Sequence, residues 1–243
     1  MTTIRPAAVA GAFYPGEPED LEALLAAMLE GASAPLDVVP KALIAPHAGY
    51  VYSGPIAATA YHLLGRHGQH IRRVVLLGPA HRVYVNGLAF PSVDAFETPL
   101  GEVPLDRRAI EHALALPGTT VSDEAHALEH CLEVQLPFLQ LVLSDFQLVP
   151  IVVGRCPAAT VAQVLENLWD DETLVIISSD LSHYHPYEEA QQLDARTSAR
   201  ILAREEGLHG EEACGAAAIN GLMRLAKKHD LAVTALDLRN SGD

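Results

Sequence analysis

The sequence predicts a three-layer α/β fold, in which helices cover both faces of a mixed or largely parallel central sheet. Two observations predict this fold. Short segments rich in Val, Leu and Ile alternate along the chain with longer segments whose apolar residues recur at helical spacing. The short segments are apolar throughout, which is typical of strands that are buried on both faces. The sequence contains no linker, repeat or low-complexity stretch, so we expect residues 1–243 to form one domain.

The first two expected strands stop at Pro46 and at Gly78-Pro79, residues that interrupt β structure. All the expected strands together cover residues 41–45, 72–77, 85–90, 147–153, 173–177 and 231–238. Residues 96–104 are expected to form an edge segment or a loop with a turn at Leu100-Gly101. Because the sequence ends in a loop soon after the last expected strand, we expect a domain that lacks a C-terminal strand.

The first expected helix is opened by Pro18-Glu19-Asp20, and Leu21, Leu24, Leu25 and Met28 fall on one of its faces. A second is expected to start at Gly54-Pro55, with the proline in the first turn, and to run to about Leu64. The remaining helices are expected at residues 106–116, 132–143, 157–169, 186–206 and 211–229.

The composition excludes several classes of function. The chain has 31 acidic and 16 basic residues and a formal net charge of −15, which disfavours binding to nucleic acid or to an anionic membrane. The N-terminus lacks the pattern of a signal peptide, and no apolar run is long enough to span a bilayer. Three cysteines without a secretion signal indicate a reducing compartment. We therefore expect a cytoplasmic protein.

Two histidines follow expected strands in the same way. His47 comes directly after a strand and Pro46, and His81 follows a strand and Pro79. Ligands of open α/β sheets gather at the carboxyl ends of the strands. The repeated context favours a functional pair, such as two metal ligands, over two loop histidines that bond to nearby carbonyl groups.

A third polar group follows the expected strand 173–177. Asp180 could accept the second ring N–H of a metal-bound histidine or orient a general base. His183 could bind a metal or move protons. A helix cap and turn would account for Asp180 but would leave His183 unexplained.

Two further candidates are weaker when they are judged from their residue types. His130 and Glu133 are three positions apart and would share a face if they lay on a helix, but such pairs are common on solvated surfaces. Cys214 comes just before the run AAAINGLM, and a helix start there would lower the pKa of its thiol. The residues alone favour a small buried side chain at this position over a ligand.

Six motifs in fixed order make the chain resemble the MEMO family, whose bacterial and archaeal members are called AmmeMemoRadiSam system protein B. The motifs are RPAAVAGAFYPG, APHAGYVYSG, LLGPAHRV, EHCLEVQLPFLQ, SSDLSHY and CGAAAINGLM. The resemblance runs from Arg5 to Asp243 and implies a fold like that of the class III extradiol dioxygenases.

The resemblance also implies a site. It makes His47, His81 and Cys214 the metal ligands, with iron or copper as the metal and zinc as a further possibility. It places His130, Glu133, Asp180 and His183 in the same pocket as candidate catalytic residues. The chain departs from the family at Cys131, where a serine is usual, and a thiol there could add a soft ligand or a disulfide partner for Cys214.

Three functions are compatible with such a site. The first is an iron- or copper-dependent redox enzyme that handles O₂, in which His183 or His130 moves protons and Asp180 orients a ligand. A thiolate in the ligand set makes catechol cleavage of the dioxygenase type a weaker expectation. The second is a non-catalytic module that binds a peptide or phosphopeptide, which the charge of −15 disfavours. The third is a partner of radical-SAM and AMMECR1-like proteins that acts on an unidentified small molecule or macromolecule.

Overall fold

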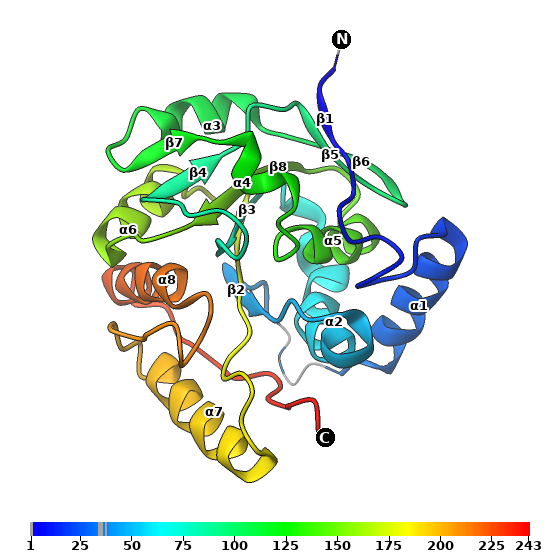
Figure 1. The fold of residues 1–243 in the computed structure, drawn as a ribbon, viewed down its shortest axis with the longest axis vertical. Helices are drawn as coiled ribbons and strands as arrows, with labels where there is room; N and C mark the ends of the chain where they lie inside the picture. The colour runs from blue at the N-terminus through cyan, green and yellow to red at the C-terminus, as the bar shows by residue number, and fades with distance from the viewer. Residues whose placement is uncertain (1, 34–35, 37) are drawn as a thin grey trace.

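Six strands form the main sheet in the order β2-β9-β3-β8-β4-β7 (Figure 1). In the computed structural model, which describes residues 2–33, 36 and 38–243, all pairs of neighbouring strands in this sheet are parallel except β8 with β4. The strands are β2 (Ala42–Ala45), β3 (Arg73–Pro79), β4 (Leu88–Phe90), β7 (Thr119–Val121), β8 (Gln147–Val153) and β9 (Thr173–Ser178). The prediction of a largely parallel sheet is confirmed.

Helices cover both faces of this sheet, as predicted. Helices α1, α2 and α5 pack together on one face, and α3, α6 and α8 lie on the other (Figure 1). The helices are α1 (Pro18–Gly31), α2 (Tyr50–His67), α3 (Arg107–Leu114), α4 (Asp123–Ala127), α5 (Leu136–Val142), α6 (Ala158–Asn167), α7 (Tyr187–Leu202) and α8 (Ala216–Lys228), with short 3₁₀ turns at Gly68–His70 and Glu133–Gln135. None of the helices in the described part of the chain has the length and apolar character needed to cross a bilayer.

The burial of the strands explains their apolar sequences. In β3, β8 and β9, which lie inside the sheet, every residue after the first is buried. β2 lies at one edge, and its residues alternate between buried and half-buried. Strands that are covered on both faces need apolar side chains at successive positions, and this is the pattern that the sequence shows.

Three strands form a second, smaller sheet that adjoins β8 of the main one. Strands β5 (Ala95–Thr98) and β6 (Gly101–Pro104) form a hairpin, and the N-terminal strand β1 (Ile4–Arg5) pairs with β5 in parallel. The edge segment expected at residues 96–104 is therefore a hairpin, and Leu100 lies in its turn as predicted. Gly101 has a φ of +113°, a conformation that side chains rarely adopt, which explains the glycine.

Several expected elements differ from the structure. The strand expected at 85–90 begins only at Leu88, and the helix expected at 132–143 begins as a 3₁₀ turn at Glu133 and becomes α5 at Leu136. Residues 231–238 form no strand, so that prediction is wrong: the segment is extended but has no strand partner. Helix α2 begins at Tyr50, four residues before the predicted start, so Pro55 lies inside the helix and not at its opening. Helix α8 begins at Ala216 and not at Glu211, because residues 210–215 form turns.

His126 on α4 is a buried histidine outside the candidate site. Its Nε2 lies 2.9 Å from the carbonyl oxygen of Ala89, and its Nδ1 has no hydrogen-bond partner among the described residues. Burial lowers the pKa of His126 to about 4, because the charged imidazolium would lose its hydration. The folded protein therefore holds this side chain in its neutral form at neutral pH.

Acidification should destabilise the protein through His126. In the unfolded chain the residue takes up a proton near its ordinary pKa of about 6.5, whereas in the folded chain it does so only near pH 4. Between these values the unfolded state binds more protons, so stability falls with falling pH, by about 3 kcal/mol in all. Urea unfolding at pH 7, 6, 5 and 4 should show this slope in the wild type, and a smaller slope in His126→Gln. Equal slopes would contradict the assignment.

Candidate metal centre

Three neighbouring strands deliver side chains to one edge of the main sheet. His47 follows β2, Asp180 follows β9 and His81 follows β3, and β9 lies between the other two strands. Parallel strands end at the same edge, so residues that follow them are brought together although they are far apart in sequence. The repeated strand-then-histidine pattern of the sequence thus corresponds to a real cluster.

The three proposed metal ligands meet at this edge. The donor atoms of His47, His81 and Cys214 all lie within 4.8 Å of one another. His47 Nε2 is 3.3 Å from Cys214 Sγ, and the rings of the two histidines are 5.2 Å apart, edge to face. Ligands bound at about 2.0–2.3 Å from one ion are separated by distances of this order. The group can therefore hold a metal ion, and the structure does not identify which one.

The pKa shifts of the three side chains favour metal binding. Burial alone would raise the pKa of Cys214, but hydrogen bonds from His47 and His81 outweigh it and lower the pKa to about 6. The same sulfur and Glu129 raise the pKa of His81 to about 9. For His47, burial lowers the pKa, yet the bond to Cys214 and the charge of Asp180 leave it raised. Cys214 is therefore a thiolate at neutral pH, the form that binds metals.

The backbone around Cys214 explains how a residue far along the chain reaches the sheet edge. The amide N–H of Cys214 donates to the carbonyl oxygen of Asp180 (3.2 Å), and the amide N–H of Asp180 donates to the sulfur (3.3 Å). Gly215 then passes so close to Ser179 that a Cβ would lie 2.7 Å from that side chain. The glycine after Cys214 is needed for this close approach.

The Nδ1 atom of each histidine contacts a different residue, on the side of the ring away from the donor Nε2. His47 Nδ1 lies 2.9 Å from Ser178 Oγ, and His81 Nδ1 lies 2.9 Å from Glu129 Oε1. The sequence suggested Asp180 as the acceptor of a second ring N–H, but this role falls to Ser178 and Glu129. Asp180 instead accepts the backbone N–H of His47 at 2.7 Å, and its other oxygen is 3.9 Å from His47 Nε2.

Glu129 is the most heavily bonded carboxylate near the site. One oxygen accepts the backbone N–H of His81 at 2.7 Å, and the other accepts His81 Nδ1 and the N–H groups of His130 and Cys131. Burial would raise the pKa of Glu129, but these bonds to the charged form outweigh it and hold the pKa well below its usual range. The residue is 2% exposed, so it is a buried anion beside the cluster.

His130 joins the cluster, as expected. Its ring stacks on His81 with centroids 4.8 Å apart, and it stands edge-on to His47 at 5.5 Å. The opposite side of His130 contacts Phe13 at 4.8 Å. His130 Nδ1 is 3.2 Å from Glu129, although the angle is not that of a hydrogen bond. The ring of His130 therefore lies against both histidines of the cluster.

Glu133, expected in the same pocket, is placed elsewhere. It is fully buried, and its carboxylate binds Arg5, the backbone N–H groups of Ala8 and Val9, and the hydroxyl of Tyr14. All of these partners belong to the N-terminal segment. The structure therefore does not bring Glu133 to the ligand cluster but makes it an anchor for the start of the chain.

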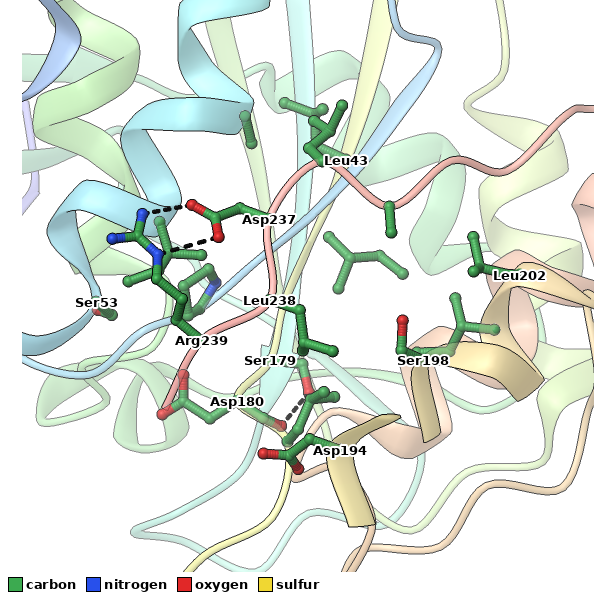
Figure 2. Close-up of a pocket in the computed structure, with 18 of the residues that line it drawn as sticks. Leu43, Ser53, Ser179, Asp180, Asp194, Ser198, Leu202, Asp237, Leu238 and Arg239 are labelled. Atoms are coloured by element: carbon green, nitrogen blue, oxygen red, sulfur yellow. Dashed lines mark hydrogen bonds and ion pairs between the residues drawn. The ribbon is translucent and has the colours of Figure 1, made fainter. Parts of the chain in front are cut away.

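Figure 2 shows a cavity of about 940 Å³ that Asp180 borders. His183 is exposed and belongs to the residues that line this cavity. Asp180 lines the same cavity, whereas His47, His81 and Cys214 are not among its described lining residues. The extended segment that carries Asp237, Leu238 and Arg239 crosses one side of it. Asp180 therefore lies between the cavity and the metal ligands, and His183 lies farther out.

Cys131 is a buried thiol behind the site. Its Sγ donates to the carbonyl oxygen of Pro79 (3.3 Å), and burial raises its pKa well above the usual range. All three cysteines are free, so the disulfide with Cys214 that the resemblance allowed is not formed in the structure. A Cβ at Gly78 would lie 2.5 Å from this sulfur, which explains why glycine occupies that position.

Sequence reasoning missed two residues that hold the ligands, Glu129 and Ser178. Glu129 stood beside His130 in the sequence, and a carboxylate next to a candidate ligand is a usual partner for a metal-bound histidine. Ser178 follows the last apolar residue of β9, where a polar residue in a strand is a weak sign of a role in the site. Neither signal distinguishes these residues from ordinary turn residues without the fold.

Known proteins match this chain over most of its length. The family model described as Memo-like protein matches residues 5–243. A MEMO1 family protein of Aquifex aeolicus is 41% identical over 214 residues, covering 86% of this chain and 77% of the relative. Another from Archaeoglobus fulgidus is 37% identical over 250 residues, covering 97% and 92%.

Among solved structures, an uncharacterized protein of Escherichia coli K12 aligns with a TM-score of 0.41 at 15% identity, covering 68% of this chain and 80% of that one. This likeness is too distant to add to the argument. The match to the family model over nearly the whole chain, with the relatives of 41% and 37% identity, is decisive: the chain belongs to the Memo-like protein family.

Proposed function

We propose that the protein is a metal-dependent redox protein that binds iron or copper through His47, His81 and Cys214. The observation that carries the proposal is the meeting of two imidazoles and a thiolate within 4.8 Å at the carboxyl edge of the sheet. A thiolate paired with imidazoles favours copper, iron or zinc over magnesium or calcium, which prefer oxygen ligands.

The residues around the ligands fit this chemistry. When bound, iron or copper would supply one-electron transfer from an external reductant, such as a thiol, to O₂, which gives superoxide. Asp180 reaches both the ligand cluster and the adjoining cavity, so it would orient a molecule that enters from the cavity. His130 would hold or release a proton at the inner side, and His183 would do so at the outer side.

The alternative of a phosphopeptide site receives less support. The charged groups that approach the donor atoms most closely include the carboxylates of Asp180 and Glu129. These would repel a phosphate group, and they would favour a cation instead. A role beside radical-SAM and AMMECR1-like proteins is compatible with the redox proposal, since such a partner could supply or consume the small molecule.

Metal analysis tests the proposal directly. Protein freed of metal and loaded anaerobically with Fe(II) or Cu(I) should retain about one ion per chain after desalting. His47→Ala, His81→Ala and Cys214→Ser should each retain less than half of this. The matched controls are His185→Ala and Cys156→Ser, which remove a histidine and a cysteine that lie outside the cluster and should bind like the wild type.

The redox step has its own readout. Loaded wild type should produce superoxide from O₂ in the presence of a thiol, measured by cytochrome c reduction that superoxide dismutase suppresses. Equal metal content in the wild type and all three ligand variants would overturn the site. Tight binding without any superoxide would overturn the redox role and leave a metal-binding protein.

A further inference from the structure

A chain of buried hydrogen bonds runs behind His47. Tyr61, Gln135 and Ser178 are each no more than 1% exposed, and they connect to the Nδ1 side of the imidazole. We propose that Gln135 and Ser178 are positioning residues that keep the proton of neutral His47 on Nδ1, so that the lone pair of Nε2 faces the metal site. The consequence for metal binding rests on the proposed function, whereas the position of the proton does not.

The direction of every bond in this chain follows from groups that can only accept. Gln135 Nε2 lies 2.8 Å from the carbonyl oxygen of Pro46, so the atom there must be the amide nitrogen. Its second N–H then points to Ser178 Oγ, also at 2.8 Å. With the amide oriented in this way, Gln135 Oε1 faces Tyr61 and accepts its hydroxyl at 2.7 Å.

The hydroxyl of Ser178 has one proton, and it donates this proton to a backbone carbonyl group. Ser178 Oγ lies 2.6 Å from the carbonyl oxygen of Cys131, to which it can only donate. It also accepts one N–H from Gln135. Toward His47 it therefore offers only a lone pair, and the 2.9 Å contact requires that His47 Nδ1 carries the hydrogen. The tautomer is set by a carbonyl group and an amide that do not touch the histidine.

This arrangement opposes the preference of the isolated side chain. In water, neutral histidine favours the tautomer with its proton on Nε2. With that tautomer, Nε2–H would donate to Cys214 Sγ at 3.3 Å, and a metal ion would have to displace this proton. By holding the proton on Nδ1, the chain of hydrogen bonds leaves Nε2 ready to bind.

The two histidines of the site are therefore held by different chemistry. His81 donates its Nδ1–H to a buried carboxylate, Glu129, whereas His47 donates to a neutral hydroxyl. A carboxylate partner makes an imidazole a stronger electron donor than a hydroxyl does. We infer a ligand set with one more basic and one less basic imidazole. For packing alone, apolar side chains in place of Ser178 and Gln135 would avoid the cost of burying polar groups.

Nuclear magnetic resonance can locate the proton in metal-free protein. Long-range ¹H–¹⁵N spectra, recorded at a pH at which the ring nitrogen shifts are those of a neutral imidazole, should show His47 protonated on Nδ1 in the wild type. Ser178→Ala removes the acceptor, and the proton should move to Nε2. Gln135→Met leaves the hydroxyl free to turn toward His47, so a mixture of the two tautomers is expected. Thr197→Val is the control, because it removes another buried hydroxyl, on α7, and should leave His47 unchanged.

Chelator competition then measures how the position of the proton affects the affinity for metal. With Zn²⁺ as a diamagnetic probe, Ser178→Ala should bind about 10- to 100-fold more weakly than the wild type, and Thr197→Val should bind equally well. A proton on Nε2 in the wild type would overturn the inference, as would an unchanged tautomer in both Ser178→Ala and Gln135→Met when circular dichroism shows them folded. A correct tautomer in protein that binds no metal would instead refute the proposed function alone.

Discussion

Replacing Glu133 by glutamine is expected to lower the free energy of unfolding by about 3–5 kcal/mol, the usual cost of breaking a buried ion pair. Glu133 and Arg5 are 0% and 4% exposed, so neither charge can be hydrated when the other is lost. The carboxylate also accepts the N–H groups of Ala8 and Val9 at 2.8 and 2.9 Å and the hydroxyl of Tyr14 at 2.6 Å. A glutamine amide would direct its nitrogen at one of these donors.

The measurement is urea unfolding followed by circular dichroism, on Glu133→Gln and on the four proteins of a double-mutant cycle, which are the wild type, Glu133→Met, Arg5→Met and the double variant. Glu133→Met alone leaves Arg5 as a buried unpaired charge and should be strongly destabilised. Arg5→Met together with Glu133→Met removes both charges, and replacing a whole buried pair is often close to neutral. The double variant should therefore be more stable than Glu133→Met. A single variant as stable as the wild type would show that the pair does not anchor the N-terminal segment.

The sequence was sufficient to predict the layers, since central strands buried on both faces must be apolar at successive positions. It failed at residues 231–238, whose mostly apolar and partly β-branched side chains favour β structure but cannot supply a partner strand. Of the backbone groups there, the N–H of Leu231 bonds back to the carbonyl oxygen of Ala226 at the end of α8. Whether a segment pairs as a strand depends on whether the fold brings it to a free edge of the sheet. A local sequence pattern does not contain this information.

The residues of the site also differ in whether the sequence alone could predict them. His47, His81 and Asp180 could be predicted because each directly follows a strand, and the ends of parallel strands meet. Cys214 follows no strand. It reaches the sheet edge through its backbone bonds to Asp180, and only the resemblance to a family indicated it.

The expectation for Glu133 failed for a local reason. The resemblance placed Glu133 in the pocket, and helical spacing would have put it on one face with His130, but residues 128–132 form no helix, and a 3₁₀ turn starts only at Glu133. With the chain turned at this point, Glu129 faces the cluster and Glu133 faces the N-terminal segment. The glutamate beside the cluster is therefore Glu129, which the sequence reasoning did not single out.

Glu129→Gln is therefore expected to weaken metal binding by about 10- to 100-fold, the usual cost of losing the partner of a metal-bound histidine. Four donors converge on the Glu129 carboxylate, including both the ring Nδ1 and the backbone N–H of His81. In the variant, an amide nitrogen would face at least one of them, and a neutral amide oxygen would bind the Nδ1–H of His81 more weakly than the carboxylate does. Chelator competition measures the affinity between pH 7 and 9.

The pH range matters because the pKa of His81 is about 9, raised by Cys214 and then by Glu129. Below that pH, a metal ion must displace a proton from His81 in the wild type, and losing Glu129 lessens this competition. The deficit of Glu129→Gln should therefore grow as the pH rises toward 9. A deficit that shrinks with rising pH would contradict the assigned role of Glu129.

Glu133→Gln is the matched control for Glu129→Gln, since the same atoms change in a second glutamate of the same segment that is equally withdrawn from solvent. The two variants should differ in which property they lose, stability or metal affinity. Glu133→Gln should lose stability and bind metal like the wild type while it is folded, whereas Glu129→Gln should lose metal affinity at every pH tested. If Glu133→Gln lost affinity with its stability intact, Glu133 would belong to the site after all, as the family resemblance implied. Loss of stability in Glu133→Gln and loss of metal affinity in Glu129→Gln would distinguish an anchor of the N-terminus from a partner of the metal ligands. The positions of the two glutamates in the sequence cannot make this distinction.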